Sequence, residues 1–314
     1  MSRCAYTHAR TGLKKNSVGR SPNLSASRGN RLGIGIFRLL LKSGGLRAAR
    51  FLARVVTWFY ARFDFTAREA AEPYLKLRFP EDADDRRALR RHFHRMLTEL
   101  ADGLILAHRL GTGRRVPIVE TGREHLPASG GVVAVLAHFG CWQASMRLLN
   151  DESGRPVNVM ARPDYNANMD KFLALGGERK FNVISTEDFS GGLIAASAAL
   201  DRGEAVIVMG DRPVEGSASV TAEFFGGRIE LPLSPWLLAA RNGVPAVPVF
   251  AELAADGRSV EVRYLPPETF PAAEGRIRPD ALIPCVKRYA GLLEEAARRS
   301  PYRVFRFGSE KSKE

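Results

Sequence analysis

The fold is decided by VVAVLAHFGCWQ, residues 132–143 of the 314-residue chain. Its first six residues are apolar and rich in valine, which is typical of a buried strand. His138 and a glycine turn follow this run, and the next residues predict a helix over 141–149. Open α/β sheets bind their ligands at the carboxyl ends of the strands. His138 is therefore expected at the ligand-binding edge of a sheet, in a position suited to catalysis.

Strands and helices alternate along the rest of the chain. Apolar runs predict strands at 132–137, 157–161, 181–185, 205–209, 246–251 and 260–264. Apolar spacing predicts helices at 89–104, 141–149, 167–175, 190–201, 235–242 and 280–299, before a strand-like tail at 302–307. The helix at 235–242 has Ser234 as its expected cap, Pro235 in its first turn and Gly243 at its end. This alternation predicts an α/β fold with a mostly parallel or mixed central sheet and helices on both faces.

Positive charge is concentrated at the N-terminus. Residues 1–63 contain thirteen lysines and arginines and no acidic residue, and the other 34 basic residues balance the 34 acidic ones. A basic arm on a neutral body predicts contact with a polyanion, either an anionic membrane surface or nucleic acid. The body does not interleave arginines with aromatic residues and has no recognised nucleic-acid module, which argues against nucleic acid. Three scattered cysteines are too few for a disulfide framework or a thiolate metal site.

Composition divides the chain into four regions. Residues 1–31 are expected to be a disordered basic tail, because they are rich in Ser, Arg, Asn and Gly. Residues 32–79 are expected to form amphipathic helices at a membrane interface, broken at Gly44-Gly45 and with arginines toward lipid phosphates. Residues 80–308 form the expected α/β domain, and 309–314 a short tail. No apolar run reaches the roughly 20 residues that span a bilayer.

Two other interpretations of the N-terminal region stay open at this point. The amphipathic segment could instead dock on the protein's own core. Residues 1–31 also have the composition of an organellar transit peptide, rich in Arg and Ser and without acidic residues.

Six segments occur in an order and at a spacing that match one protein family. They are HFGCWQ at 138–143, VMARPDYN at 159–166, VMGDRP at 208–213, EFFGG at 223–227, SPWLLAARNGVPAVPVF at 234–250 and PYRVFRF at 301–307. Together they resemble the bacterial lipid A biosynthesis acyltransferases of the lysophospholipid acyltransferase superfamily. The resemblance extends from about residue 32 to residue 307.

The resemblance implies an enzyme at the cytoplasmic face of the bacterial inner membrane. It would transfer a fatty acyl chain from a thioester of acyl carrier protein or coenzyme A to a hydroxyl of a lipid or glycolipid acceptor, without a metal or other cofactor. His138 would be the general base, and Arg162 and Asp211 would line the active site. Substrate binding is expected at four further residues: Gly140, Trp142, Phe225 and Gly226.

Gln143 stands where that family has an acid in its His-x4-Asp/Glu motif. An amide can hydrogen-bond an imidazole and orient it, so Gln143 is counted with the catalytic residues, but it cannot offset the charge of the imidazolium. Three interpretations are open. In the first, the enzyme runs slowly, or another carboxylate, with Asp211 the best candidate, takes the place of the acid. Alternatively, the enzyme has diverged to a different acceptor, or the chain is a catalytically impaired, lipid-binding relative.

Overall fold

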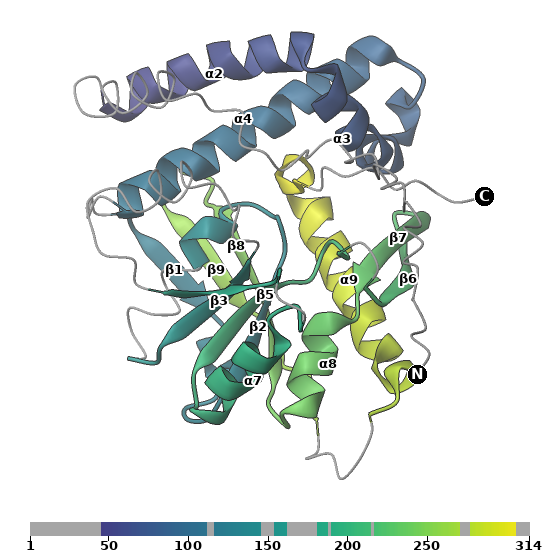
Figure 1. Cartoon of the computed structure of the whole chain (residues 1–314). Coiled ribbons are helices and arrows are strands. Elements are labelled where there is room, and N and C mark those ends of the chain that lie inside the picture. The colour runs from purple at the N-terminus through teal and green to yellow at the C-terminus, as the bar shows by residue number, and fades with distance from the viewer. Residues whose placement is uncertain are drawn as a thin grey trace, which may run out of the picture.

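A computed structural model describes residues 45–111, 116–145, 154–161, 181–187, 190–214, 217–270 and 277–305 of the chain. These residues form a central sheet with helices packed around it and a separate two-stranded hairpin at one side (Figure 1). The predicted helix at 167–175 and most of the one at 141–149 lie outside the described residues, which include helical turns at 142–145.

The central sheet has seven strands in the order β1-β9-β8-β2-β5-β3-β4. Their bounds are β1 (Ile118–Thr121), β2 (Val132–Leu136), β3 (Val157–Ala161), β4 (Asn182–Ser185), β5 (Ala205–Met209), β8 (Ala246–Leu253) and β9 (Val260–Tyr264). β8 and β9 pair antiparallel, and the other neighbours pair parallel. The predicted mixed, mostly parallel sheet is thus confirmed.

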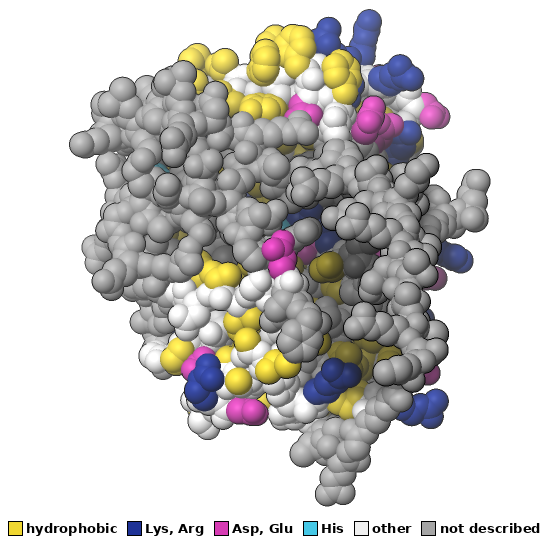
Figure 2. Space-filling model, viewed as in Figure 1, with side chains coloured by type: hydrophobic (Ala, Val, Ile, Leu, Met, Phe, Trp, Pro, Cys, Tyr) yellow, Lys and Arg dark blue, Asp and Glu magenta, His cyan; other side chains and the backbone are white. Residues whose placement is uncertain are grey.

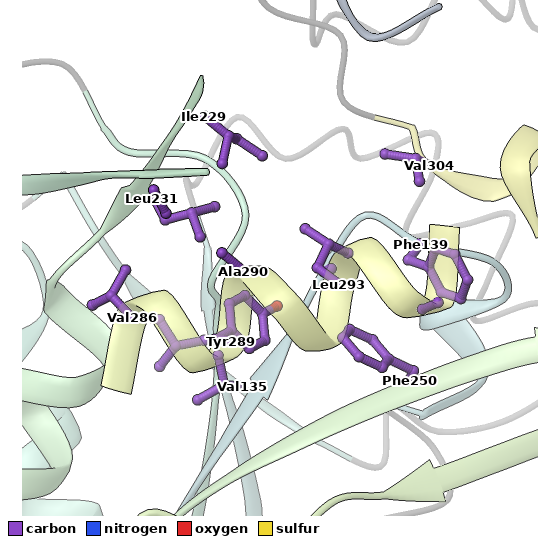
Figure 3. Close-up of a cluster of buried hydrophobic side chains, with 14 of the residues drawn as sticks. Val135, Phe139, Ile229, Leu231, Phe250, Val286, Tyr289, Ala290, Leu293 and Val304 are labelled. Carbon is purple, nitrogen blue, oxygen red and sulfur yellow. The ribbon is translucent and has the colours of Figure 1, made fainter. Parts of the chain in front are cut away.

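Both faces of the sheet centre are buried, which explains why its strands read as continuous apolar runs. Along β2, Val133 and Val135 join one hydrophobic cluster, while Val132, Ala134 and Leu136 join the other. Helices α7 (Leu193–Asp201), α8 (Ser234–Arg241) and α9 (Ile283–Arg299) are among the elements that contribute to the first cluster. Figure 3 shows α9 lying on this face, with the Tyr289 ring next to Val135. The second cluster includes Leu106 from helix α4 (Arg86–Gly111).

The structure corrects four details of the sequence-based predictions. Strand β1 and the hairpin of β6 (Ser219–Phe224) and β7 (Gly227–Pro232) are additional strands. Ser234 does not cap α8, because it is the first helical residue and the helix has no side-chain cap. The predicted helix at 280–299 begins as a 3-10 turn, Pro279–Leu282, before α9. The described part of the tail, up to residue 305, is not a strand, since it forms a 3-10 turn, Pro301–Arg303, and an isolated bridge at Val304.

Two N-terminal helices, α2 (Gly45–Phe63) and α3 (Phe65–Arg78), precede α4. The Asp64 carboxylate separates them by accepting a hydrogen bond from the amide of Ala67, as an N-cap does. α2 lies along α4 through a face of small residues: Ala49, Ala53, Thr57 and Ala61. None of the described helices is long and apolar enough to cross a bilayer.

The predicted orientation of the α2 arginines is wrong for Arg50. Its guanidinium pairs with Asp102 of α4, with 3.0 Å between Nε and Oδ1, and donates to the carbonyl of Gly257. Arg50 therefore faces the protein, because a carboxylate partner lies on the neighbouring helix. Arg47 and Arg54 on the same helix remain exposed.

The packing of α2 against α4 predicts the effect of a larger side chain in the contact between the two helices. Ala49 is fully buried beside Ala53 and Ile105. We expect Ala49→Leu to lower the free energy of unfolding in urea by about 1–3 kcal/mol, because added carbons have no space. Val55→Leu adds one carbon at an exposed position on the same helix and should change stability by less than about 0.5 kcal/mol. Equal midpoints for the two variants would contradict this packing.

Candidate active site

Strand register brings His138 and Asp211 together. β2 and β5 are parallel neighbours in which Leu136 is paired with Met209. Two residues further along each strand, the chain reaches His138 and Asp211 at the same edge of the sheet. The two strand ends are also tied directly, because the amide of Gly210 donates to the carbonyl of Leu136 at 2.7 Å.

The imidazole of His138 and the carboxylate of Asp211 form a hydrogen-bonded pair. Nδ1 of His138 lies 3.0 Å from Oδ1 and 3.1 Å from Oδ2 of Asp211. The Asp211 side chain is almost fully buried, whereas 22% of the His138 side chain is exposed. If Nδ1 carries the proton that this carboxylate accepts, Nε2 of the neutral ring has a lone pair to accept another proton. The pair has the arrangement of a general base and its orienting acid.

The surroundings of Asp211 keep it ionised. Burial acts to raise the pKa of this carboxyl, but the charge and hydrogen bond of His138 outweigh it and hold the pKa well below its usual value. Arg212 contributes in the same direction, with its Nε 3.9 Å from Oδ2 of Asp211. An ionised Asp211 can offset the positive charge that His138 acquires on protonation.

Gly140 lets the loop after His138 pass close to β8. It adopts a left-handed backbone conformation, with φ of 58°, and a Cβ placed there would lie 2.2 Å from the carbonyl oxygen of Ala251. The amide of Cys141 donates to the same oxygen at 2.7 Å. This gives Gly140 a backbone reason for being glycine, and its expected contact with substrate stays a prediction.

Cys141 and Trp142 pack beside the pair. Burial raises the pKa of the Cys141 thiol to about 12, so the thiol stays protonated at neutral pH and cannot act as a nucleophile. The Trp142 ring meets the His138 ring edge to face, with 5.2 Å between the ring centroids. Trp142 thus limits how the imidazole can rotate, and its expected binding of substrate stays a prediction.

Gln143 does not contact the imidazole through a hydrogen bond. Its side chain is buried, and its Oε1 atom has no hydrogen-bond partner in the part of the chain that the structure describes. Position 143 therefore does not orient His138 here. Asp211, identified from the sequence as the best substitute for the motif acid, holds the ring nitrogen.

The remaining predicted residues lie elsewhere or are not described. Phe225 and Gly226 form the turn between β6 and β7, where the amide of Phe225 donates to Oε2 of Glu294 at 2.8 Å. The Phe225 ring lies within 5.4 Å of the Arg78 guanidinium and 5.0 Å of that of Arg298. These contacts fix the turn against α3 and α9, so a role in substrate binding stays a prediction. Arg162 lies outside the described residues.

Sequence reasoning missed Tyr289 as a support of the pair. Its hydroxyl, buried in the core, donates to the carbonyl of Leu136 at 2.9 Å, just before His138. Burial raises the pKa of Tyr289 well above its usual value, and the charge of Asp211 adds to this rise. Its only sequence signal is a place on the apolar face of a long helix. Among the described residues, no cluster of His, Cys, Asp and Glu could hold a metal ion.

Gly140 provides a stability test with a matched control. Gly140→Ala should lower the free energy of unfolding by at least about 2 kcal/mol more than Gly130→Ala, measured by urea denaturation. Both glycines have a positive φ, but a Cβ on Gly130 meets no atom within 4 Å. The difference therefore isolates the collision with Ala251. Similar decreases in the free energy of unfolding of the two variants would show that the carbonyl of Ala251 does not exclude a Cβ at position 140.

Comparison with known proteins adds three findings. No curated protein gives a significant match. The chain is similar to the solved structure of the 1-acyl-sn-glycerophosphate (LPA) acyltransferase PlsC from Thermotoga maritima, with 17% identity, a TM-score of 0.36, and coverage of 78% of this chain and 96% of that one. The family described as bacterial lipid A biosynthesis acyltransferase matches residues 20–301. Since this match includes most of the chain and the whole of the His138–Asp211 pair, the protein belongs to the bacterial lipid A biosynthesis acyltransferase family.

Proposed function

We propose that this lipid acyltransferase moves a fatty acyl chain from a thioester of acyl carrier protein or coenzyme A to a hydroxyl of a lipid or glycolipid acceptor. One observation carries the proposal: a partly exposed imidazole at the carboxyl edge of the sheet has its Nδ1 on a buried, ionised carboxylate. Such a pair is suited to remove a proton from an alcohol.

In the proposed reaction, Nε2 of His138 accepts the proton of the acceptor hydroxyl while its oxygen attacks the thioester carbonyl. The tetrahedral intermediate then collapses, the carbon–sulfur bond breaks, and the departing thiolate takes the proton from the imidazolium. Asp211 stabilises the imidazolium between these two steps. The position of Asp211 supports the interpretation in which another carboxylate replaces the motif acid at Gln143.

The backbone amides after His138 are already engaged. Those of Phe139, Gly140 and Cys141 donate to the carbonyls of other residues. They are therefore not available for the oxyanion that forms in the intermediate, which needs donors of its own. Arg162, expected from the sequence to line the site, is our candidate for the positive charge and N–H donors that stabilise the oxyanion.

Substitutions at the pair test this mechanism. We expect His138→Ala to abolish acyl transfer and Asp211→Asn to lower kcat by about 10²–10⁴-fold, because the imidazolium loses its counter-charge. The measurement is thiol release from an acyl thioester in the presence of a lipid hydroxyl acceptor, with thermal unfolding as a check on folding. Full activity of His138→Ala would refute the assigned base.

Gln143→Glu is the informative comparison for this experiment. Asp211 already occupies Nδ1, so we expect a second carboxylate at position 143 to leave kcat within a few-fold of the natural protein. A large gain would show that position 143 still needs its acid, and inactivity of every form would favour the lipid-binding relative.

Exposed apolar side chains on α2 and at the start of α3 support binding to a membrane surface. Figure 2 shows hydrophobic side chains gathered over α2 at the top of the molecule. The residues of this membrane patch are Phe51, Val55, Val56, Trp58, Phe59, Phe63 and Phe65, each at least 42% exposed. Contiguous apolar surface of this kind marks interaction sites, and an interfacial helix buries such a face in lipid.

The membrane patch and the site share one end of the molecule. α4 crosses the carboxyl edge of the sheet, where a Cβ on Gly103 would lie 3.3 Å from the carbonyl oxygen of Gly140. Figure 1 shows α2 on the far side of α4 from the sheet. We therefore propose peripheral association with the cytoplasmic face of the bacterial inner membrane, where the exposed arginines of α2 meet anionic lipid.

Vesicle sedimentation tests this placement. The protein should sediment with anionic phospholipid vesicles at low salt, and less so as ionic strength rises. The double variant Phe51→Ser, Trp58→Ser should bind at least about tenfold more weakly, because two large apolar side chains no longer enter the lipid. Ile194→Ser removes an exposed apolar side chain from α7 and should bind as the natural protein does. Equal binding by all three proteins would refute the membrane patch.

A further inference from the structure

The backbone of the catalytic histidine is held by the C-terminal segment of the chain. The carbonyl of His138 accepts a hydrogen bond from the amide of Phe305 at 2.7 Å. The amide of Gly140 donates to the carbonyl of Arg303 at 2.8 Å. These two bonds form an antiparallel bridge around Phe139 and Val304. The position of His138 therefore depends on where residues 303–305 are fixed.

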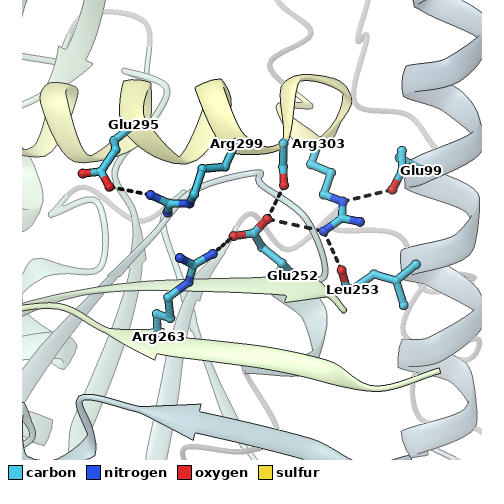
Figure 4. A network of polar contacts seen from close by, with 8 residues as sticks. Glu99, Glu252, Leu253, Arg263, Glu295, Arg299 and Arg303 are labelled. Carbon is cyan, nitrogen blue, oxygen red and sulfur yellow. Dashed lines mark hydrogen bonds and ion pairs between the residues drawn. The ribbon is translucent and has the colours of Figure 1, made fainter. Parts of the chain in front are cut away.

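Arg303 fixes that segment through its side chain (Figure 4). Its guanidinium lies 3.0 Å from Oε2 of Glu99 on α4 and 3.3 Å from Oε2 of Glu252 on β8. It also donates to the carbonyl of Leu253 at 2.5 Å. One side chain thus joins α4, β8 and the C-terminal segment. Its partners come from both elements that lie against the loop after His138.

The ion pair with Glu252 is costly to break because Glu252 is a buried carboxylate. Only 5% of its side chain is exposed, and it also accepts from Ser300 and pairs with Arg263 of β9. Removing one cation from a buried ionic group leaves charge that the remaining partners must rearrange to neutralise. The segment that carries Arg303 would move in that rearrangement, and the bridge to His138 would move with it.

We infer that Arg303 is a positioning residue for acyl transfer, which holds the backbone of His138 in register with Asp211. The inference rests on the proposed role of His138 as the base. Arg303 acts through its own carbonyl and the amide of Phe305, and its side chain reaches neither the imidazole nor Asp211 in the described contacts. A displacement of about 1 Å between reacting groups can lower a rate about 100-fold. Loss of the contacts that position His138 should therefore lower kcat.

The test compares Arg303 with its neighbour Arg299. We expect Arg303→Gln to lower kcat about 10- to 100-fold and to leave the KM for the acyl thioester within about twofold. Arg303→Lys, which keeps a cation for Glu252 and Glu99, should recover part of kcat. Arg299 pairs with Glu295 at the surface near the end of α9, so Arg299→Gln should leave both constants unchanged.

Amide hydrogen exchange at Gly140 and Phe305 reports the bridge without any activity measurement. It should speed up in Arg303→Gln and stay unchanged in Arg299→Gln. Unchanged exchange, or an unchanged kcat in a protein whose His138→Ala variant is inactive, would overturn the positioning role. Activity that survives in His138→Ala would instead overturn the proposed function, while the exchange result would still decide whether Arg303 holds the bridge.

If Arg303→Gln does not fold, Glu99→Gln serves in its place. This change removes one partner of Arg303 at a position where a third of the side chain is exposed. We expect kcat to fall and amide exchange at Gly140 to speed up, both by less than in Arg303→Gln. No change in either quantity would overturn the inference.

Discussion

The structure around the site depends on the contact between a buried carboxylate and an imidazole at the ends of two parallel strands. A carboxylate as buried as that of Asp211 is costly unless a partner and hydrogen bonds compensate it. His138 supplies that compensation, and it can do so because β2 and β5 end in register. The same contact that stabilises the charge leaves Nε2 directed away from the carboxylate. The register of β2 and β5 thus accounts both for the burial of the Asp211 carboxylate and for the orientation of the His138 ring.

Sequence patterns predicted the buried strands well and the exposed ones poorly. The predicted strands at 157–161, 205–209 and 260–264 agree with β3, β5 and β9 residue for residue. A continuous apolar run identifies β5 because both of its faces are buried, whereas β9, with the sequence VEVRY, alternates apolar and charged residues. Strand β1 and the hairpin of β6 and β7, which mix exposed and less exposed positions, were not predicted.

The site was predictable in its parts and not in its contacts. A motif identified His138, and its missing acid led to Asp211 as the substitute. Their meeting depends on strand pairing across 73 positions of sequence, which no local pattern encodes. The same holds for Arg303 and Glu252, which are 51 positions apart. Arg50 shows the limit most clearly, because helical periodicity placed it on a face without revealing Asp102 opposite.

The two faces of α2 differ in the size of their side chains. Alanines and a threonine set the distance to α4, and phenylalanine and tryptophan side chains project outward. Because the bulky residues contribute little to the interior, exchanging them should hardly change how the rest of the molecule holds together. The outer face of this helix can thus change in sequence while the inner face keeps the same contact with α4.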